Sequence, residues 1–221
     1  MENERYTKTI KNRFEKDAVA FDAIYSKENG EFHTWFNKTF RKPVFERFDV
    51  AFRTLSDLNG KTILDIGCGS GIYSINFALR GAAKVVGVDF SHAMLNIAKN
   101  RAKEQQVESI CDFQLNDFNK ITFNEKFDYS IAMGVFDYLQ DPISFLRKMK
   151  SVTKNTIIGS FPGYSLIRGP LRKLRYALTS KGSVHYYSRA DMERIIHEVK
   201  FQHSEIIPVK TGSGFILVAT P

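Results

Sequence analysis

The chain has 221 residues, of which 43% are hydrophobic, so it can form one α/β domain with a full core. Two cysteines exclude a disulfide framework, and neither a signal peptide nor a transmembrane run is evident, so we expect a cytoplasmic protein. The net charge of +8 permits nucleic acid, an anionic substrate or a membrane surface as a partner, without choosing among them.

Two helices are expected before the first strand. Residues 9–25 place apolar side chains near one helical face, and the polar residues 26–34 follow as a loop. Residues 40–55 carry a second apolar stripe. Because Pro43 is tolerated only in the first turn of a helix, this helix is predicted to begin near Arg41.

The stretch Lys61 to Tyr73, K-T-I-L-D-I-G-C-G-S-G-I-Y, predicts a strand, a glycine turn and a helix. A short apolar run suits a buried strand, and apolar side chains at helical spacing begin at Ile72. Between them, every second residue is a glycine: Gly67, Gly69 and Gly71. Such a turn lets a ligand approach the backbone closely and reach the free N–H groups at the start of the helix.

A second predicted strand, residues 85–88, ends at Asp89, 22 residues after Gly67. A carboxylate at this position can accept hydrogen bonds from a ribose diol. The dinucleotide fingerprint G-x-G-x-x-G fails, because Ile72 stands where its third glycine should be. The spacing is instead D-x-G-x-G-x-G, with Asp65 ahead of the glycines. This carboxylate would repel a pyrophosphate and attract an ammonium group.

Strands and helices alternate from there to the C-terminus. Ser91 is a helix N-cap candidate, Pro142 suits the first turn of the next helix, and Ser188 with Asp191 predicts a capping box. The remaining strands are expected at residues 110–115, 127–133, 155–161, 204–209 and 214–220. This alternation predicts a doubly wound α/β fold with a parallel sheet, whose last two strands are joined by a short loop and run antiparallel.

Residues 162–187 interrupt the alternation as an insertion after the fifth strand. The insertion holds five Lys or Arg side chains and no acid. Three interpretations stay open: a helical lid over a small-molecule pocket, a basic face for an anionic substrate or nucleic acid, and a membrane-surface helix at residues 166–178. We expect a single domain that comprises an N-terminal helical cap (1–58), a ligand-binding core (60–161), the insertion, and a C-terminal helix with two strands (188–221).

The D-x-G-x-G-x-G turn resembles motif I of the class I S-adenosylmethionine-dependent methyltransferases, and the resemblance covers residues 60–160 and, less closely, 188–220. It implies a Rossmann-like, seven-stranded sheet with an antiparallel last strand, S-adenosyl-L-methionine as cofactor and S-adenosyl-L-homocysteine as product. The N-terminal F-D-A-I-Y is similar to small-molecule methyltransferases, which implies in-line methyl transfer to a small-molecule acceptor. The acceptor atom and the oligomeric state stay open. The absence of an N-P-P-Y-like tetrapeptide after the fourth strand counts against an amide or exocyclic nitrogen as acceptor.

The resemblance also implies site residues, carried over from L-D-I-G-C-G-S-G, V-G-V-D-F-S and L-N-D-F. Asp89 would contact the ribose hydroxyls, and Phe90 would lie against the adenine face. Asp117 would lie near the adenine amino group, while Phe118 would stack or offer a main-chain N–H. The implied cofactor-binding residues are Asp65, Gly67, Cys68, Gly69, Gly71, Asp89, Phe90, Asn116, Asp117, Phe118, Met133 and Tyr25.

A general base is needed only if the acceptor must lose a proton, and the candidates are Asp137, His185 and His33. No metal site is expected. Cys68 is not expected to act as a nucleophile, because no activating base is evident near it in the sequence. Three alternatives remain: an RNA methyltransferase that uses the basic insertion, a non-catalytic S-adenosylmethionine-binding module, and an NAD-dependent oxidoreductase, against which Ile72 counts.

Overall fold

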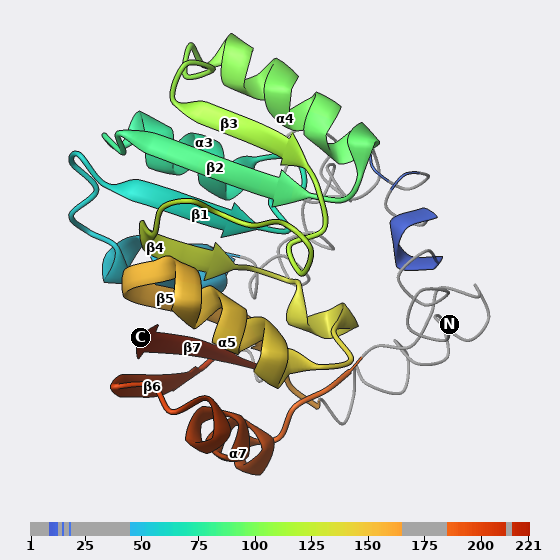
Figure 1. Cartoon of the computed structure of the whole chain (residues 1–221), viewed down its shortest axis with the longest axis vertical. Helices are drawn as coiled ribbons and strands as arrows, with labels where there is room; N and C mark the ends of the chain where they lie inside the picture. The colour runs from blue at the N-terminus through green and yellow to red at the C-terminus, as the bar shows by residue number, and fades with distance from the viewer. Residues whose placement is uncertain (1–8, 13–14, 16–17, 19–44, 165–184, 211–213) are drawn as a thin grey trace, which may run out of the picture.

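The computed structural model describes residues 9–12, 15, 18, 45–164, 185–210 and 214–221, and Figure 1 shows their arrangement. The predicted loop at 26–34, the start of the second helix and most of the insertion lie outside these residues. Tyr25 and His33 lie outside them as well. Helical backbone is observed at residues 9–12, 15 and 18 and again at 45–54, within the two predicted N-terminal helices.

One seven-stranded sheet has the strand order β3-β2-β1-β4-β5-β7-β6. The first five strands pair in parallel, and β7 runs antiparallel to both of its neighbours. The strands are β1 (Thr62–Ile66), β2 (Lys84–Asp89), β3 (Cys111–Leu115), β4 (Phe127–Ala132), β5 (Thr153–Pro162), β6 (His203–Pro208) and β7 (Gly214–Thr220). The predicted doubly wound, mostly parallel sheet is confirmed.

Four α-helices and one short 3-10 helix connect the strands in the described core: α3 (Ile72–Leu79), α4 (His92–Glu104), η1 (Phe136–Tyr138), α5 (Pro142–Val152) and α7 (Arg189–Val199). The predicted caps are present. Ser91 Oγ accepts from Met94 N at 3.2 Å, and Ser188 and Asp191 form a reciprocal capping box at the start of α7. Pro142 occupies the first turn of α5, where its missing N–H costs no helical hydrogen bond.

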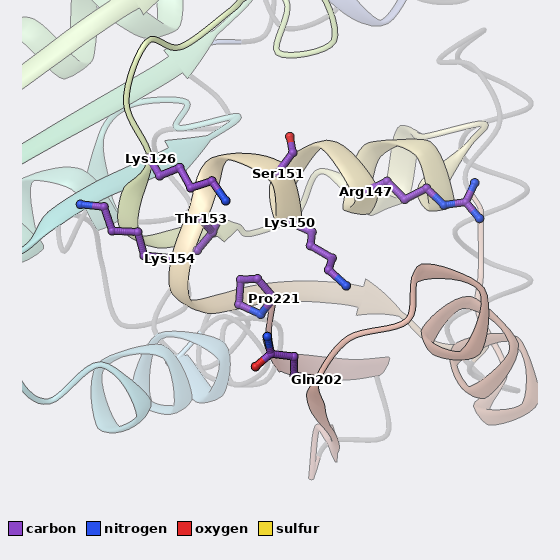
Figure 2. Close-up of a pocket in the computed structure, with 8 residues that line it drawn as sticks. All are labelled: Lys126, Arg147, Lys150, Ser151, Thr153, Lys154, Gln202 and Pro221. Atoms are coloured by element: carbon purple, nitrogen blue, oxygen red, sulfur yellow. The ribbon is translucent and has the colours of Figure 1, made fainter.

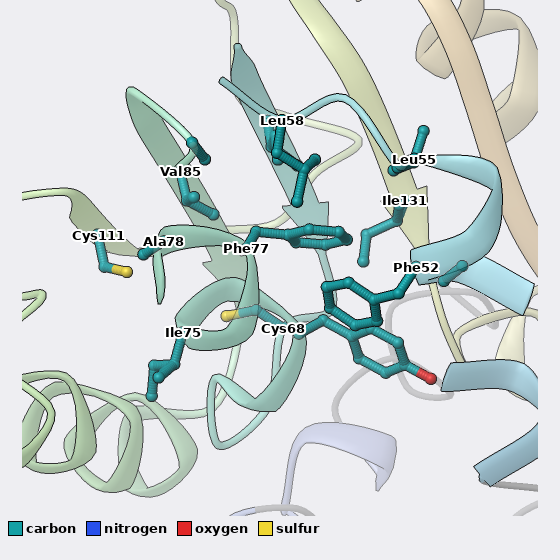
Figure 3. Packing of buried hydrophobic residues seen from close by; sticks show 14 of the residues in the cluster. Phe52, Leu55, Leu58, Cys68, Ile75, Phe77, Ala78, Val85, Cys111 and Ile131 are labelled. Atoms are coloured by element: carbon teal, nitrogen blue, oxygen red, sulfur yellow. The ribbon is translucent and has the colours of Figure 1, made fainter. Parts of the chain in front are cut away.

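The two faces of the sheet are covered by different helices. Residues from α3, α4 and the helical segment 45–54 form one buried apolar cluster, and residues from α5, α7 and η1 form the other. Figure 3 shows the first cluster, in which Phe52 and Phe77 lie with ring centroids 4.6 Å apart. Successive side chains of a strand point to opposite faces of the sheet, so Ile131 belongs to the first cluster and Ala132 to the second.

β5 begins at Thr153, directly after α5 ends, which is two residues earlier than predicted. Two buried hydrogen bonds explain this abrupt change from helix to strand. Thr153 Oγ1 donates to Met149 O at 2.6 Å, and it lies 2.7 Å from Ser130 Oγ on the neighbouring strand. The threonine therefore closes the helix and joins the sheet at once.

The chain leaves β1 and β4 toward opposite faces of the sheet, although these strands are neighbours. β1 continues into α3, on the first face, while β4 continues through η1 into α5, on the second. Such a topological switch point opens a crevice beside the carboxyl ends of the strands, where ligands bind in open α/β sheets. None of the helices in the described part of the chain is long and apolar enough to cross a membrane.

Candidate functional site

The carboxyl ends of β1 to β4 lie along one edge of the sheet, to which the arrowheads point in Figure 1. Backbone hydrogen bonds link the loops along this edge. Gly69 N, after β1, donates to Asp89 Oδ2 at 2.9 Å, and Asn116 N, after β3, donates to Asp89 O at 3.0 Å. The structure therefore brings the ends of three strands together around Asp89.

The glycine loop after β1 needs glycine for two different reasons. All three glycines have positive φ: 68° at Gly67, 53° at Gly69 and 77° at Gly71. A Cβ added at Gly67 would lie 2.5 Å from Val135 Cγ2, so the loop packs tightly against the segment that follows β4. A Cβ added at Gly69 would meet no atom within 4 Å. Gly69 thus faces open space beside Asp89, as a ligand cradle requires.

Asp89 is buried, with 9% of its surface exposed, and its oxygens accept from Ser91 N at 2.8 Å and from Gly69 N. Burial raises the pKa of Asp89, and the backbone N–H bonds oppose that rise. A carboxylate offers about four lone-pair sites, so hydroxyl groups of a ligand can still bind. The geometry suits a carboxylate that is fixed in place by the backbone and able to accept from a diol.

Asp65 is even more deeply buried, with 2% exposed. Its Oδ2 accepts from Ser74 Oγ at 2.6 Å, so the carboxylate is directed at α3 beneath the glycine loop. Burial raises the pKa of Asp65 to about 7, Ser74 opposes this rise, and the nearby charge of Asp89 adds to it. Ser74 was not among the predicted site residues. Its only signal is a polar residue on the inward face of an amphipathic helix.

The residues after β3 form a turn. Asn116 is exposed, its Oδ1 accepts from Asp117 N, and Asp117 Oδ1 accepts from Asn119 N at 2.9 Å. The Phe118 ring is 5% exposed and lies 4.9 Å from the Phe145 ring in the second apolar cluster. This ring belongs to the core, so of the two roles considered for Phe118 the main-chain contact fits better.

Phe90 and Met133 both lie at the carboxyl edge and are partly exposed. Phe90 follows directly on Asp89, and Met133 follows β4 and also packs against the first apolar cluster. Gly134, next along the chain, donates its N–H to Ser160 Oγ on β5 at 2.8 Å. The edge thus continues as a connected series of loops from β3 to β5.

Two of the three catalytic candidates lie together. Asp137 is in η1 and is 6% exposed, and His185 N donates to Asp137 O at 3.0 Å. Tyr187 OH donates to Phe136 O at 3.1 Å, which fixes the returning end of the insertion against η1. His185 Nε2 is buried and has no hydrogen-bond partner among the described residues. The structure therefore places the main chain of His185 against η1, which follows β4, and leaves the buried ring nitrogen of His185 unpartnered among the described residues.

Cys68 is buried within the glycine loop. Burial foremost, with the charges of Asp65 and Asp89, raises the pKa of the Cys68 thiol well above its ordinary value. The raised pKa favours the protonated thiol at neutral pH, and the thiolate is the nucleophilic form of cysteine. Within the described ranges, no three His, Cys, Asp or Glu side chains are grouped as metal ligands.

A surface pocket elsewhere is basic, but it lies at the amino ends of the strands (Figure 2). Its lining residues are Lys126, Arg147, Lys150, Ser151, Thr153, Lys154, Gln202 and Pro221. Three of its cations make structural contacts: Arg147 with Glu198 O at 3.0 Å, Lys150 with Lys200 O, and Lys154 with Asp128 at 3.7 Å. These contacts hold α5 and the start of β5 against neighbouring elements, and the pocket is separate from the carboxyl edge of the sheet.

Comparison with known sequences identifies related proteins. Residues 57–161 match the family model described as "Methyltransferase domain". The chain is 34% identical over 98 residues to the ubiquinone biosynthesis O-methyltransferase of Coxiella burnetii, covering 44% of this chain and 41% of that protein. It is 32% identical over 143 residues to the protein of the same name from Histophilus somni, covering 57% and 59%. The chain thus spans less than two thirds of the length of these relatives.

Solved structures share the fold at lower sequence identity. Magnesium protoporphyrin IX methyltransferase from Synechocystis PCC 6803, solved with bound SAH, has a TM-score of 0.79 at 22% identity, covering 97% of this chain and 99% of that one. An S-adenosylmethionine dependent methyltransferase from Mesorhizobium loti has a TM-score of 0.62 at 18% identity, covering 80% and 98%. At these identities, the two structures establish a common fold.

Proposed function

We propose that this protein, whose residues 57–161 match the methyltransferase domain model, transfers a methyl group from S-adenosylmethionine to a small-molecule acceptor. One observation carries the proposal. Asp89 ends β2 as a buried carboxylate held by two backbone N–H groups, and Gly69 beside it faces open space. This arrangement suits a ligand that offers a ribose diol, whereas a pyrophosphate would meet two buried carboxylates, Asp65 and Asp89.

The residues present fit S-adenosylmethionine. The glycine loop leaves room at Gly69, and an added Cβ at Gly134 would likewise meet no atom within 4 Å. Asp89 would accept from the ribose hydroxyls, and Phe90 would lie along the adenine. The turn at Asn116 and Asp117 would receive the adenine edge. The remaining proposed contacts are Asp65, Gly67, Cys68, Gly71, Phe118 and Met133, together with Tyr25 of the N-terminal segment.

When bound, the cofactor supplies a methyl group made electrophilic by its sulfonium, so the chain contributes chiefly position and electrostatics. We assign the acceptor side to Asp137 and His185. His185 Nε2 is a buried polar atom without a partner among the described residues, and a buried group of this kind gains most from a hydrogen bond to a ligand. In its neutral form, the ring can accept a hydroxyl proton as the acceptor oxygen attacks.

The names of the relatives support oxygen as the acceptor atom, since both compared sequences are called O-methyltransferases. An RNA acceptor or a membrane contact would depend on the basic insertion, whose residues 166–178 lie outside the described residues. We favour a small molecule because both compared sequence relatives are named as O-methyltransferases of ubiquinone biosynthesis, whose named product is a small molecule. A non-catalytic binding module would show the same cofactor affinity without turnover.

Calorimetric titration of the purified protein with S-adenosylmethionine, S-adenosylhomocysteine and NAD tests the cofactor assignment. Micromolar binding of the first two, with none of NAD, supports it, and binding of NAD alone would overturn it. Methyl transfer from radiolabelled cofactor is then measured with a panel of catechols, with magnesium protoporphyrin IX and with total RNA as acceptors. Label in RNA alone would contradict the small-molecule assignment, and cofactor binding without any transfer would favour the binding module.

A further inference from the structure

The turn that carries Asp89 is completed by a residue from far away in the chain. Four consecutive N–H groups follow Asp89 and Phe90 at the start of α4, and the local sequence satisfies only two of them. Ser91 N donates to Asp89 Oδ1 at 2.8 Å, and Met94 N donates to Ser91 Oγ at 3.2 Å. The two N–H groups between them have no acceptor of their own, because the first turn of α4 contains no acidic residue.

Glu15 supplies both missing acceptors. Its Oε1 accepts from His92 N at 2.6 Å and its Oε2 accepts from Ala93 N at 3.1 Å, although 77 residues separate Glu15 from His92. The carboxylate thus bridges two adjacent N–H groups at a helix N-terminus, where the helix dipole favours negative charge. Every N–H of the turn from Ser91 to Met94 then has a partner.

The segment that carries Glu15 has buried side chains on both sides of it in the sequence. Ile10 and Ala18, from the same helical stretch, are 3% and 4% exposed. Figure 1 shows this segment in blue, at the edge of the sheet to which β1–β4 point. Burial is the main cause that raises the pKa of Asp89, and the negative charge of Glu15 adds to it, so the two carboxylates are electrostatically close.

We infer that Glu15 is a positioning residue for Asp89, and that it fixes the turn which would hold the ribose of the cofactor. This inference rests on the function proposed above. Glu15 holds His92 N and Ala93 N, Asp89 holds Ser91 N and Gly69 N, and the four contacts together lock the end of β2 to both α4 and the glycine loop. Loss of the two Glu15 contacts therefore frees the turn and weakens the two contacts of Asp89.

The test uses the full-length protein with Glu15→Ala and Glu15→Gln. The glutamine keeps one acceptor oxygen and removes the charge. Glu108→Ala is the control, because Glu108 is an exposed carboxylate beyond the other end of α4. Two quantities are measured: amide hydrogen exchange at His92 and Ala93, and the dissociation constant of S-adenosylhomocysteine. We expect faster exchange at both amides in Glu15→Ala and a dissociation constant raised about three- to thirtyfold, with a smaller rise in Glu15→Gln.

A double-mutant cycle with Asp89→Asn separates positioning from plain stabilisation. If Glu15 acts through Asp89, then Glu15→Ala has little further effect on S-adenosylhomocysteine affinity in the Asp89→Asn background. A Glu15→Ala protein that loses exchange protection but keeps its affinity would overturn the inference and leave Glu15 as a helix cap. Unchanged exchange at His92 and Ala93 would overturn the contact itself. If the wild-type protein binds neither cofactor form, the proposed function fails together with this role, while exchange still reports the contact.

Discussion

Ionised Asp65 is expected to destabilise the folded protein at neutral and higher pH, and Asp65→Asn should remove this cost. The carboxyl is 2% exposed, and burial raises its pKa from 3.8 to about 7. A shift of this size corresponds to a free energy on the order of 4 kcal/mol. Asparagine carries no charge, but it accepts a weaker hydrogen bond from Ser74 Oγ. This weaker bond reduces the gain in stability by about 1 kcal/mol. The variant should therefore be more stable than the wild type by about 3 kcal/mol at pH 8.

The sign of the pH dependence follows from proton binding. Between pH 3.8 and about 7, the folded state keeps the Asp65 proton while the unfolded state has lost it. The contribution of Asp65 to stability is thus fully present below pH 3.8 and is lost as pH rises to about 7. The stability advantage of Asp65→Asn should grow over the same window and stay constant above it.

Urea unfolding of both proteins at several pH values between 4.5 and 8.5 measures this difference. Asp112→Asn serves as the matched control, because Asp112 is exposed on β3 and its replacement should leave the pH dependence unchanged. Parallel stability curves for wild type and Asp65→Asn would refute the reasoning. So would an Asp65→Asn protein that is less stable than the wild type at pH 8.

Three further changes test other parts of the site. Gly69→Val should abolish S-adenosylhomocysteine binding in calorimetry, because the new side chain enters the open space beside the loop. The positive φ at this position disfavours any residue but glycine, so the variant should also lose about 1–2 kcal/mol of stability. Retained binding would contradict the cradle. Asp89→Asn should weaken that binding by about 1.5–3 kcal/mol, since a charge-assisted contact is lost, and unchanged affinity would refute the ribose contact. Tyr187→Phe should lower the unfolding free energy by about 1–3 kcal/mol in urea, because Phe136 O loses its buried donor; an unaltered midpoint would argue against that bond.

Local signals made much of the fold predictable. The glycine turn, the N-caps at Ser91 and Ser188 and the proline at the start of α5 each act within a few residues of the element they define. The alternation of strands and helices then restricts the topology to a doubly wound sheet. The boundary at Thr153 was mispredicted because its hydrogen bond to Ser130 belongs to the paired strand and is invisible in the local sequence.

The candidate site also contains residues that local sequence predicts and residues that only the packing of separate elements brings together. Asp89 and the glycine loop could be predicted, because their spacing along the chain reflects one β-α-β unit. The contact between Ser74 and Asp65 and that between His185 and Asp137 could not, since each depends on how separate elements pack. Glu15 is the extreme case: nothing near it in sequence indicates that its carboxylate reaches the start of α4.

The order of the last strands has a consequence for synthesis on the ribosome. β7 follows β6 in the chain but lies between β5 and β6 in the sheet, so β6 emerges before the strand with which it pairs. Until β7 arrives, the edge of β5 is unpaired and β6 has no place in the sheet. An open strand edge of this kind invites pairing with other chains. The nascent chain is therefore expected to be most prone to aggregation after β5 and β6 have emerged and before β7 pairs with them.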